Sequence, residues 1–287
     1  PGSPVPAGTS FAVEVAYHGT PLAADLTPGP MVTYADLDAG LGGEDLDEFS
    51  VGQGAWFVGD DEIFIFGEPS GHRFWYPVNE HPADKATYTA TYTVDAPFQV
   101  VANGSLVERA DSGGTSTFTW SSRDPMASYL VTFHAGRLDI EEMTTSSGIP
   151  VVLSFHENVP EAQREIFREL PEMVDFAETI FGPYPFESIG AAVVGMDLMG
   201  VALETQTIPV YGSYGDGREA ELPEWAPEEL ELTISHELAH QWFGNAVSLQ
   251  QWSDIWLNEG FAGYSEVLWV EHAWGTAARD GMLADLI

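Results

Sequence analysis

The stretch His236–His240 reads H-E-L-A-H, and it constrains the fold of this chain more than any other feature. Residues four apart in a helix stand one turn apart on the same face, so both imidazoles can reach one metal ion. Glu237 lies about 100° around that helix from His236, where its carboxylate can take a proton from a water that the metal activates. The pattern therefore predicts a helix that carries a catalytic metal centre.

Glu259 is the expected third ligand. Eighteen residues, 241 to 258, separate it from His240. Three protein ligands leave one coordination position open, which is the arrangement of a catalytic zinc, whereas structural zinc sites are usually closed by four ligands and rich in cysteine. The chain has no cysteine. We therefore predict one Zn²⁺ held by His236, His240 and Glu259; the alternative is a pair of surface histidines on an acidic helix.

The residues around the motif predict two helices. Pro227 suits the first position of the helix that carries the histidines, and Gly244 can end it. Between them, apolar residues recur at helical spacing: Leu230, Ile234, Leu238 and Trp242. Ser253 is the expected cap of a second helix, which carries Glu259 and runs towards Gly275.

Glu266 lies seven residues after Glu259, two helical turns on and on the same face. Its carboxylate can accept the second ring N–H of a ligand histidine and fix the tautomer of that ring. The alternative is an ordinary solvated glutamate. We predict the supporting role.

Residues 1 to 143 are typical of β-structure and contain no convincing helix. The strand candidates are short runs of β-branched and aromatic residues at 11–17, 56–58, 63–66, 87–94, 98–101, 115–120 and 129–133. Many short strands separated by Gly, Pro, Asn and Asp favour a sandwich or saddle of antiparallel sheets.

The pattern changes near residue 143 to strands that alternate with helices. Strand candidates lie at 149–155, 189–194 and 201–210, and a helix is expected from Pro160 to about residue 180, with Pro171 as a kink or boundary. We therefore predict an α+β fold with two domains, a β-rich domain at 1–143 and a catalytic domain of mixed sheet plus helices at 144–287.

Charge excludes several functions. The chain has 9 Lys+Arg against 45 Asp+Glu, a formal net charge of -36. Such a surface repels nucleic acid and anionic membranes, and it favours solubility or the attraction of cationic substrates. No apolar run is long enough to span a membrane. The sequence does not determine the cellular compartment, although secretion is favoured over a salt-adapted cytoplasm.

The H-E-x-x-H motif, its spacing to Glu259 and the sequence W-L-N-E-G-F-A at 256–262 resemble the aminopeptidase N family of gluzincin metallopeptidases. The resemblance implies a β-rich N-terminal domain followed by the first part of a thermolysin-like zinc catalytic domain. It also implies removal of N-terminal residues from peptides with a free N-terminus, and we expect these residues to be neutral or basic.

The family's G-x-M-E-N segment matches residues 200–205, which read G-V-A-L-E-T. Glu204 is thereby implied to bind the free α-amino group of the substrate, and main-chain groups of Val201 and Ala202 are implied to hold its backbone. Leu203 and Thr205 stand where the family has Met and Asn. This difference bears on which substrate side chains the first pocket prefers, more than on binding of the amine.

Residues 74–86 resemble a segment of the family's first domain that ends in D-x-P-x-x-K-A. Glu68, fourteen residues before Pro82, falls where the family has a second amine-binding acid. The family's transition-state tyrosine lies well beyond the glutamate ligand, and Tyr264 is too close to Glu259 to be that residue. The resemblance therefore implies a family fragment that lacks both ends and is weakly active or inactive alone.

The leading hypothesis is a zinc aminopeptidase with Glu237 as general base. One alternative is a catalytically silent or incomplete member that acts as a peptide-binding module. Another is a related zinc hydrolase that acts on a different substrate, such as an epoxide or an internal peptide bond. Glu204 argues against an endopeptidase, because an acid that binds an ammonium selects a chain terminus.

Overall fold

The computed structural model describes residues 8–21, 55–59, 61–198 and 200–285. The strands are β1 (Trp56–Gly59), β2 (Glu62–Ile65), β3 (Thr89–Asp95), β4 (Gln99–Ala102), β5 (Ser105–Ser112), β6 (Thr115–Ser121), β7 (Phe133–Gly136), β8 (Leu138–Thr144), β9 (Pro150–His156), β10 (Ile189–Val193), β11 (Ala202–Leu203) and β12 (Val210–Tyr211). The helices are α3 (Glu161–Phe167), α4 (Leu170–Phe181), α5 (Ala226–His240), α6 (Trp256–Ala273) and α7 (Thr276–Asp285).

The first half of the chain forms two antiparallel sheets, with strand orders β1-β2-β7-β4 and β3-β6-β5. Buried aromatic and aliphatic side chains fill the space between them, among them Phe133 of β7, whose ring meets that of Tyr92 on β3 at 4.7 Å. On β3 and β6, threonines face each other in pairs on the outer side, as in Thr91–Thr119 with Oγ1 atoms 3.0 Å apart. The predicted antiparallel sandwich is confirmed.

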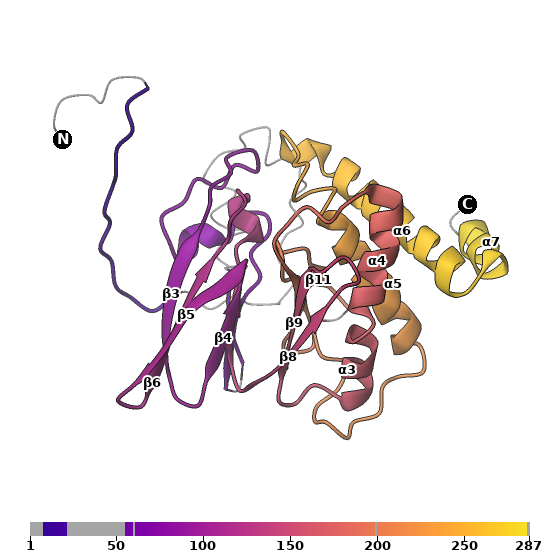
Figure 1. Cartoon of the computed structure of the whole chain (residues 1–287), viewed down its shortest axis with the longest axis horizontal. Coiled ribbons are helices and arrows are strands. Elements are labelled where there is room, and N and C mark those ends of the chain that lie inside the picture. The colour runs from indigo at the N-terminus through magenta and orange to yellow at the C-terminus, as the bar shows by residue number, and fades with distance from the viewer. Residues whose placement is uncertain (1–7, 22–54, 60, 199, 286–287) are drawn as a thin grey trace, which may run out of the picture.

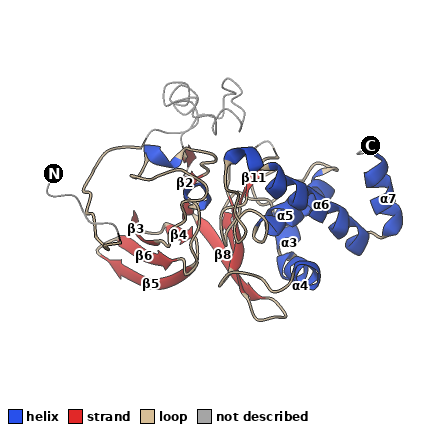
Figure 2. Ribbon diagram, turned by 90° about the horizontal axis from the view of Figure 1, so that it is seen from above, coloured by secondary structure: helices blue, strands red, loops and turns tan. Residues whose placement is uncertain are grey.

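The second half is built on a five-stranded mixed sheet with the order β11-β12-β10-β9-β8. The three inner strands are parallel, and β8 and β11 are antiparallel edges. Because side chains alternate along a strand, Val151, Leu153 and Phe155 pack against the helices, while Val152 on the same strand packs towards the first half. Figure 2 shows the helices on one side of this sheet and the antiparallel sheets on the other.

The two halves share a core and a buried polar junction. Ala192, Val194 and Val210 from the five-stranded sheet belong to the same apolar cluster as the first sheet. Asn103, at the end of β4, donates from Nδ2 to the carbonyls of Leu130 (2.9 Å) and Gln206 (2.7 Å). The β-rich half therefore fixes the position of the segment that follows β11.

Three strand predictions were wrong. Tyr129–Phe133 begins as a 3₁₀ turn over Ser128–Leu130, because a fully buried apolar run cannot be distinguished from a strand by periodicity. Residues 201–210 form two short strands rather than one, since the chain turns between them and Thr207 has a φ of 67°. Residues 11–17 are not paired and run apart from the sheets with Phe11 and Val13 exposed (Figure 1).

The helix predictions were closer. The expected helix at 160–180 is interrupted after Phe167, and Pro171 lies in the first turn of α4, where its missing N–H is not needed. Pro227 likewise lies in the first turn of α5. The expected cap at Ser253 was wrong, because a 3₁₀ turn over Trp252–Asp254 precedes α6 and Ile255 stands at its N-cap.

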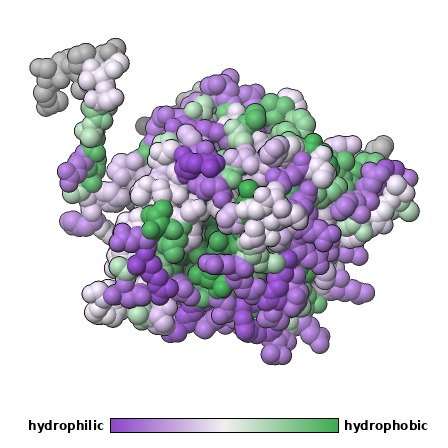
Figure 3. Space-filling view, in the orientation of Figure 1, coloured by the Kyte–Doolittle hydropathy of each residue, from purple (hydrophilic) through white to green (hydrophobic). Residues whose placement is uncertain are grey.

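The change from the first two sheets to the five-stranded sheet falls close to the expected domain boundary. β8 pairs with β9 along its whole length, from Leu138 opposite His156 to Thr144 opposite Pro150. The boundary at 143/144 itself stays a prediction. Among the described residues, no helix is long and apolar enough to cross a membrane. Figure 3 shows apolar side chains gathered in a hollow at the centre of the face that lies between β4 and β8.

Candidate metal centre and active site

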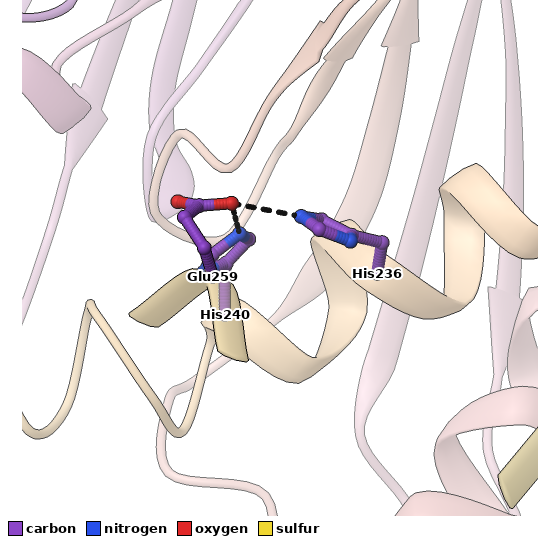
Figure 4. A group of neighbouring side chains, drawn as sticks. All are labelled: His236, His240 and Glu259. Carbon is purple, nitrogen blue, oxygen red and sulfur yellow. Dashed lines mark hydrogen bonds and ion pairs between the residues drawn. The ribbon is translucent and has the colours of Figure 1, made fainter. Parts of the chain in front are cut away.

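Three side chains from two helices converge at one point (Figure 4). His236 and His240 project from α5, and Glu259 projects from the first turn of α6. Glu259 Oε2 lies 3.2 Å from Nε2 of His236 and 3.6 Å from Nε2 of His240. These donor atoms all lie within 4.8 Å of one another, which is close enough for a single ion to bind all three.

Small residues allow α5 and α6 to pack side by side at this point. Ser265 Oγ donates to the carbonyl of Ser235 across the interface at 3.0 Å, and Ala239 and Ala262 are fully buried. The segment that joins the helices is anchored by Trp252, whose ring meets that of Tyr129 at 5.1 Å. This packing brings Glu259 to the histidines, although eighteen residues lie between it and His240.

Each histidine ring is held through its outer nitrogen. His236 Nδ1 lies 2.7 Å from Glu266 Oε1, and His240 Nδ1 lies 3.1 Å from the main-chain carbonyl of Phe243. Since both partners are acceptors, each Nδ1 carries the proton and each Nε2 lone pair faces the shared point. Two imidazole nitrogens and one carboxylate oxygen form a donor set that suits Zn²⁺.

The ionisable groups around this point shift one another's pKa. Burial alone would raise the pKa of Glu259, but its contacts with His236 and His240 outweigh burial and lower that pKa to about 2. Burial alone would lower the pKa of His240, but the Glu204 carboxylate and the contact with Glu259 raise it to about 9. The carboxylates therefore make the site attractive to a cation.

Glu237 and Glu204 form a second group beside the first. Their carboxylates and His240 lie within 4.8 Å of one another, and both glutamates are buried. Glu237 Oε2 and Glu204 Oε1 have no hydrogen-bond partner among the described residues. Burial raises the pKa of Glu237 to about 8. Buried acceptors without donors indicate a place for a ligand that brings N–H or O–H groups.

Glu68 approaches the same group from the β-rich half, three residues after β2. Burial raises the pKa of Glu68 well above its usual range, and the carboxylate of Glu204 is the largest charge acting in the same direction. The fold therefore brings the two acids that the sequence suggested for amine binding into one neighbourhood, although 135 residues lie between them.

Val201 and Ala202 lie at the edge of the five-stranded sheet. Val201 is exposed, and Ala202 begins β11, opposite Tyr211 of β12. A pocket of about 250 Å³ adjoins this edge and the metal ligands. Its lining includes Gly200, Ala202, Thr233, His236, Glu237 and Glu266. The main chain at 201–202 thus borders the space in front of the ligands.

Sequence reasoning missed three residues of this neighbourhood. Gln241 and Asn245 donate from their side-chain amides to the carbonyl of Glu204, and Tyr129 is buried where the Glu204 and Glu68 carboxylates raise its pKa further than burial alone. The spacing of Glu237, Gln241 and Asn245, each four residues from the next, was an available signal for a shared face. No local pattern marked Tyr129.

The fold and these converging ligands are those of a zinc metallopeptidase domain. Residues 171–286 match the family model described as the peptidase family M1 domain. The chain therefore belongs to the M1 peptidases, the family of aminopeptidase N, and the cofactor of this family, zinc, suits the donor set described above.

The relatives give the extent of the match. Human glutamyl aminopeptidase is 30% identical over 76% of this chain, and aminopeptidase M1 of Arabidopsis thaliana is 28% identical over 70%. The chain spans only 23% of the length of each. The M1 zinc metallopeptidase of Deinococcus radiodurans matches with a TM-score of 0.70 and 29% identity, over 81% of this chain and 51% of its own. A mutant of that protein is bound to a Tyr-Ser-Ala substrate.

Proposed function

We propose that this protein is a zinc-dependent aminopeptidase that hydrolyses the N-terminal peptide bond of peptides. The observation that carries the proposal is the pairing of two groups around His240. One is the ligand set with Glu259, and the other contains Glu237 and Glu204, each with one buried carboxylate oxygen that has no hydrogen-bond partner among the described residues. A metal centre beside such acids suits a substrate that presents both a carbonyl and an ammonium.

The residues take distinct roles in this proposal. Zinc, when bound by His236, His240 and Glu259, supplies a Lewis acid that polarises the scissile carbonyl and acidifies water. Glu237 takes the proton of the attacking water and passes it to the leaving amine. Its position suits both transfers, because Glu237 lies beside His240 and lines the pocket.

Recognition of the free N-terminus is assigned to the two buried acids beside Glu237 and His240. Glu204 and Glu68 hold the substrate ammonium by charge-assisted hydrogen bonds, which place the first peptide bond at the metal. Main-chain groups of Val201 and Ala202, at the sheet edge, hold the substrate backbone as an added strand would be held. Together these contacts restrict cleavage to the terminal residue.

The proposed substrates are peptides with a neutral or basic N-terminal residue. The described residues that line the 250 Å³ pocket include three glutamates and no lysine or arginine. The net charge of -36 favours the approach of cationic peptides. The Tyr-Ser-Ala peptide held by the Deinococcus relative supports peptides as the substrate class. Secretion stays a prediction from composition, and detection of the tagged protein in culture medium tests it.

Metal analysis and hydrolysis of aminoacyl-p-nitroanilides by the full-length gene product test this proposal. We expect one zinc per chain and turnover of the free-amine substrate. Glu237→Ala should keep the zinc and lose at least about a hundredfold in kcat. Glu228→Ala, an exposed glutamate on the same helix, is the matched control and should behave as the unmodified protein.

Three outcomes would contradict the proposal in different places. Absence of bound zinc would show that the protein is not a zinc enzyme. Cleavage that survives Glu237→Ala would show that Glu237 is not the general base. Glu204→Ala should abolish the preference for a free over an acetylated amino terminus, and an unchanged preference would remove Glu204 from amine recognition.

A further inference from the structure

The main-chain carbonyl of Glu204 accepts hydrogen bonds from two side-chain amides of the segment that directly follows α5, the ligand helix that carries His236 and His240. Asn245 Nδ2 donates to it at 2.7 Å, and Gln241 Nε2 donates to it at 3.2 Å. Both amide side chains are completely buried. A buried carbonyl needs only one donor, so two donors converging from the same segment define the position of this atom more tightly than burial requires.

Gln241 also holds the turn that follows Glu204. Its Oε1 accepts from the main-chain N–H of Thr207 at 3.0 Å, and Thr207 Oγ1 in turn accepts from the N–H of Gly104 at 2.7 Å. Thr207 has a φ of 67°, a conformation that a threonine holds only when surrounding contacts determine it. The turn is thus tied to the ligand helix on one side and to the β-rich half on the other.

These contacts place Glu204 relative to the metal ligands. Gln241 directly follows His240, and its Nε2 also lies 3.4 Å from the carbonyl of Glu237. One carboxylate oxygen of Glu204, Oε1, has no hydrogen-bond partner among the described residues, so the main chain of Glu204 contributes to placing it. A shift of that main chain would move the carboxylate away from His240 while leaving the ligand set intact.

We propose that Gln241 and Asn245 are positioning residues that fix the distance between the Glu204 carboxylate and the metal centre, and so determine that a free amino terminus is bound one residue from the scissile bond. This inference rests on the proposed function and extends it to two residues that touch neither metal nor substrate. The pair acts on ligand selection through Glu204, beyond any contribution to stability.

Binding of a zinc-chelating probe tests the inference without requiring turnover. Alanine hydroxamate and its N-acetyl form are titrated by calorimetry into the zinc-loaded 287-residue chain, and the ratio of their affinities reports amine recognition. We expect Asn245→Ala and Gln241→Met each to lower this ratio by about tenfold, because a displaced carboxylate loses a charge-assisted hydrogen bond. Affinity for the N-acetyl form and zinc content should stay unchanged.

Ser248→Ala is the matched control. Ser248 Oγ donates to the carbonyls of Gly244 (2.9 Å) and Asn245 (3.1 Å), so its loss loosens the same loop without touching the Glu204 carbonyl. The control should retain the full ratio. In a Glu204→Ala background, Asn245→Ala should produce no further loss, because both substitutions act on the same ammonium contact.

The outcomes separate this inference from the proposed function. A full affinity ratio in folded, zinc-loaded Asn245→Ala or Gln241→Met would overturn the inference alone, as would an equal loss in Ser248→Ala. No preference for the free amine in the unmodified chain would overturn the proposed function and this inference together. Thermal melting of each variant establishes that it is folded, and the near-isosteric Gln241→Met serves if Asn245→Ala does not fold.

Discussion

Glu266 Oε1 lies 2.7 Å from Nδ1 of His236, and the two residues come from adjacent helices. The contact orients the imidazole so that its Nε2 faces Glu259 and His240. Carboxylates in this position usually raise the basicity of a ligand histidine and fix its ring. The close approach of α5 and α6 therefore places both the proposed third ligand, Glu259, and the proposed support for His236, Glu266.

Substitution of Glu266 is expected to weaken zinc binding without abolishing it. Glu266→Ala should reduce zinc affinity by about 10- to 100-fold, because the His236 ring loses the acceptor that holds its tautomer. Competition with a chromophoric chelator measures the change. Glu271→Ala, on the same helix and paired with Arg279 instead, is the control. Equal affinities for the two variants would show that Glu266 is an ordinary surface glutamate.

Zinc is expected to stabilise the folded chain. At free zinc a thousand times above Kd, binding to the folded state alone contributes about 4 kcal/mol. In a domain of this size each kcal/mol corresponds to about 2–4 °C in Tm. Thermal melts with a chelator and with added zinc measure this shift. Glu259→Ala should remove it, and magnesium, which prefers all-oxygen sites, should not reproduce it. A Tm independent of zinc would contradict the predicted site.

Arg164 is expected to be a major contributor to stability. Its guanidinium is fully buried, donates to the carbonyls of His156 (2.9 Å) and Val159 (3.0 Å), and pairs with Asp139 at 2.9 Å. Arg164→Met should reduce the free energy of unfolding by about 3 kcal/mol, because buried carbonyls lose their donors. Urea unfolding followed by circular dichroism measures the loss.

Arg168 provides the comparison on the same stretch of chain. It forms ion pairs with Glu141, Glu161 and Glu165, but it is partly exposed. Arg168→Met should cost only about 0–1 kcal/mol, since water screens these pairs. If the two arginine variants lost similar stability, burial would not be the deciding factor.

Asn103 is expected to matter for the junction between the two halves. Besides its two donated bonds, its Oδ1 accepts from the N–H of Thr132 at 2.6 Å. Asn103→Ala should lower the free energy of unfolding by about 3 kcal/mol, because the Gln206 carbonyl and the Thr132 N–H lose their buried partner and the Leu130 carbonyl keeps only the N–H of Gln206. Asn79→Ala removes an amide that bonds Asp84 on the surface and should change stability by less than about 0.5 kcal/mol. Chemical denaturation measures the free energy of unfolding of both variants, and equal losses would contradict the role given to Asn103.

Local pattern was sufficient for the elements whose residues repeat with a clear period. The four-residue spacing in α5 predicted a helix with both histidines on one face, and the alternating run at 87–94 predicted β3. β5 was not foreseen, because all of its residues are exposed and it forms by pairing with β6 rather than by burying a face. The run at 201–210 failed because contacts from elsewhere turn the chain at Thr207.

The sequence by itself determined which two histidines are proposed as metal ligands, since two histidines one helical turn apart need no distant information to share an ion. Only the tertiary structure decided what surrounds them. Glu68 comes from the β-rich half, Glu204 from the end of an edge strand, and the amides of Gln241 and Asn245 join that strand to the ligand helix. Such contacts join residues far apart along the chain, and they form only when the sheets and helices pack around a common core.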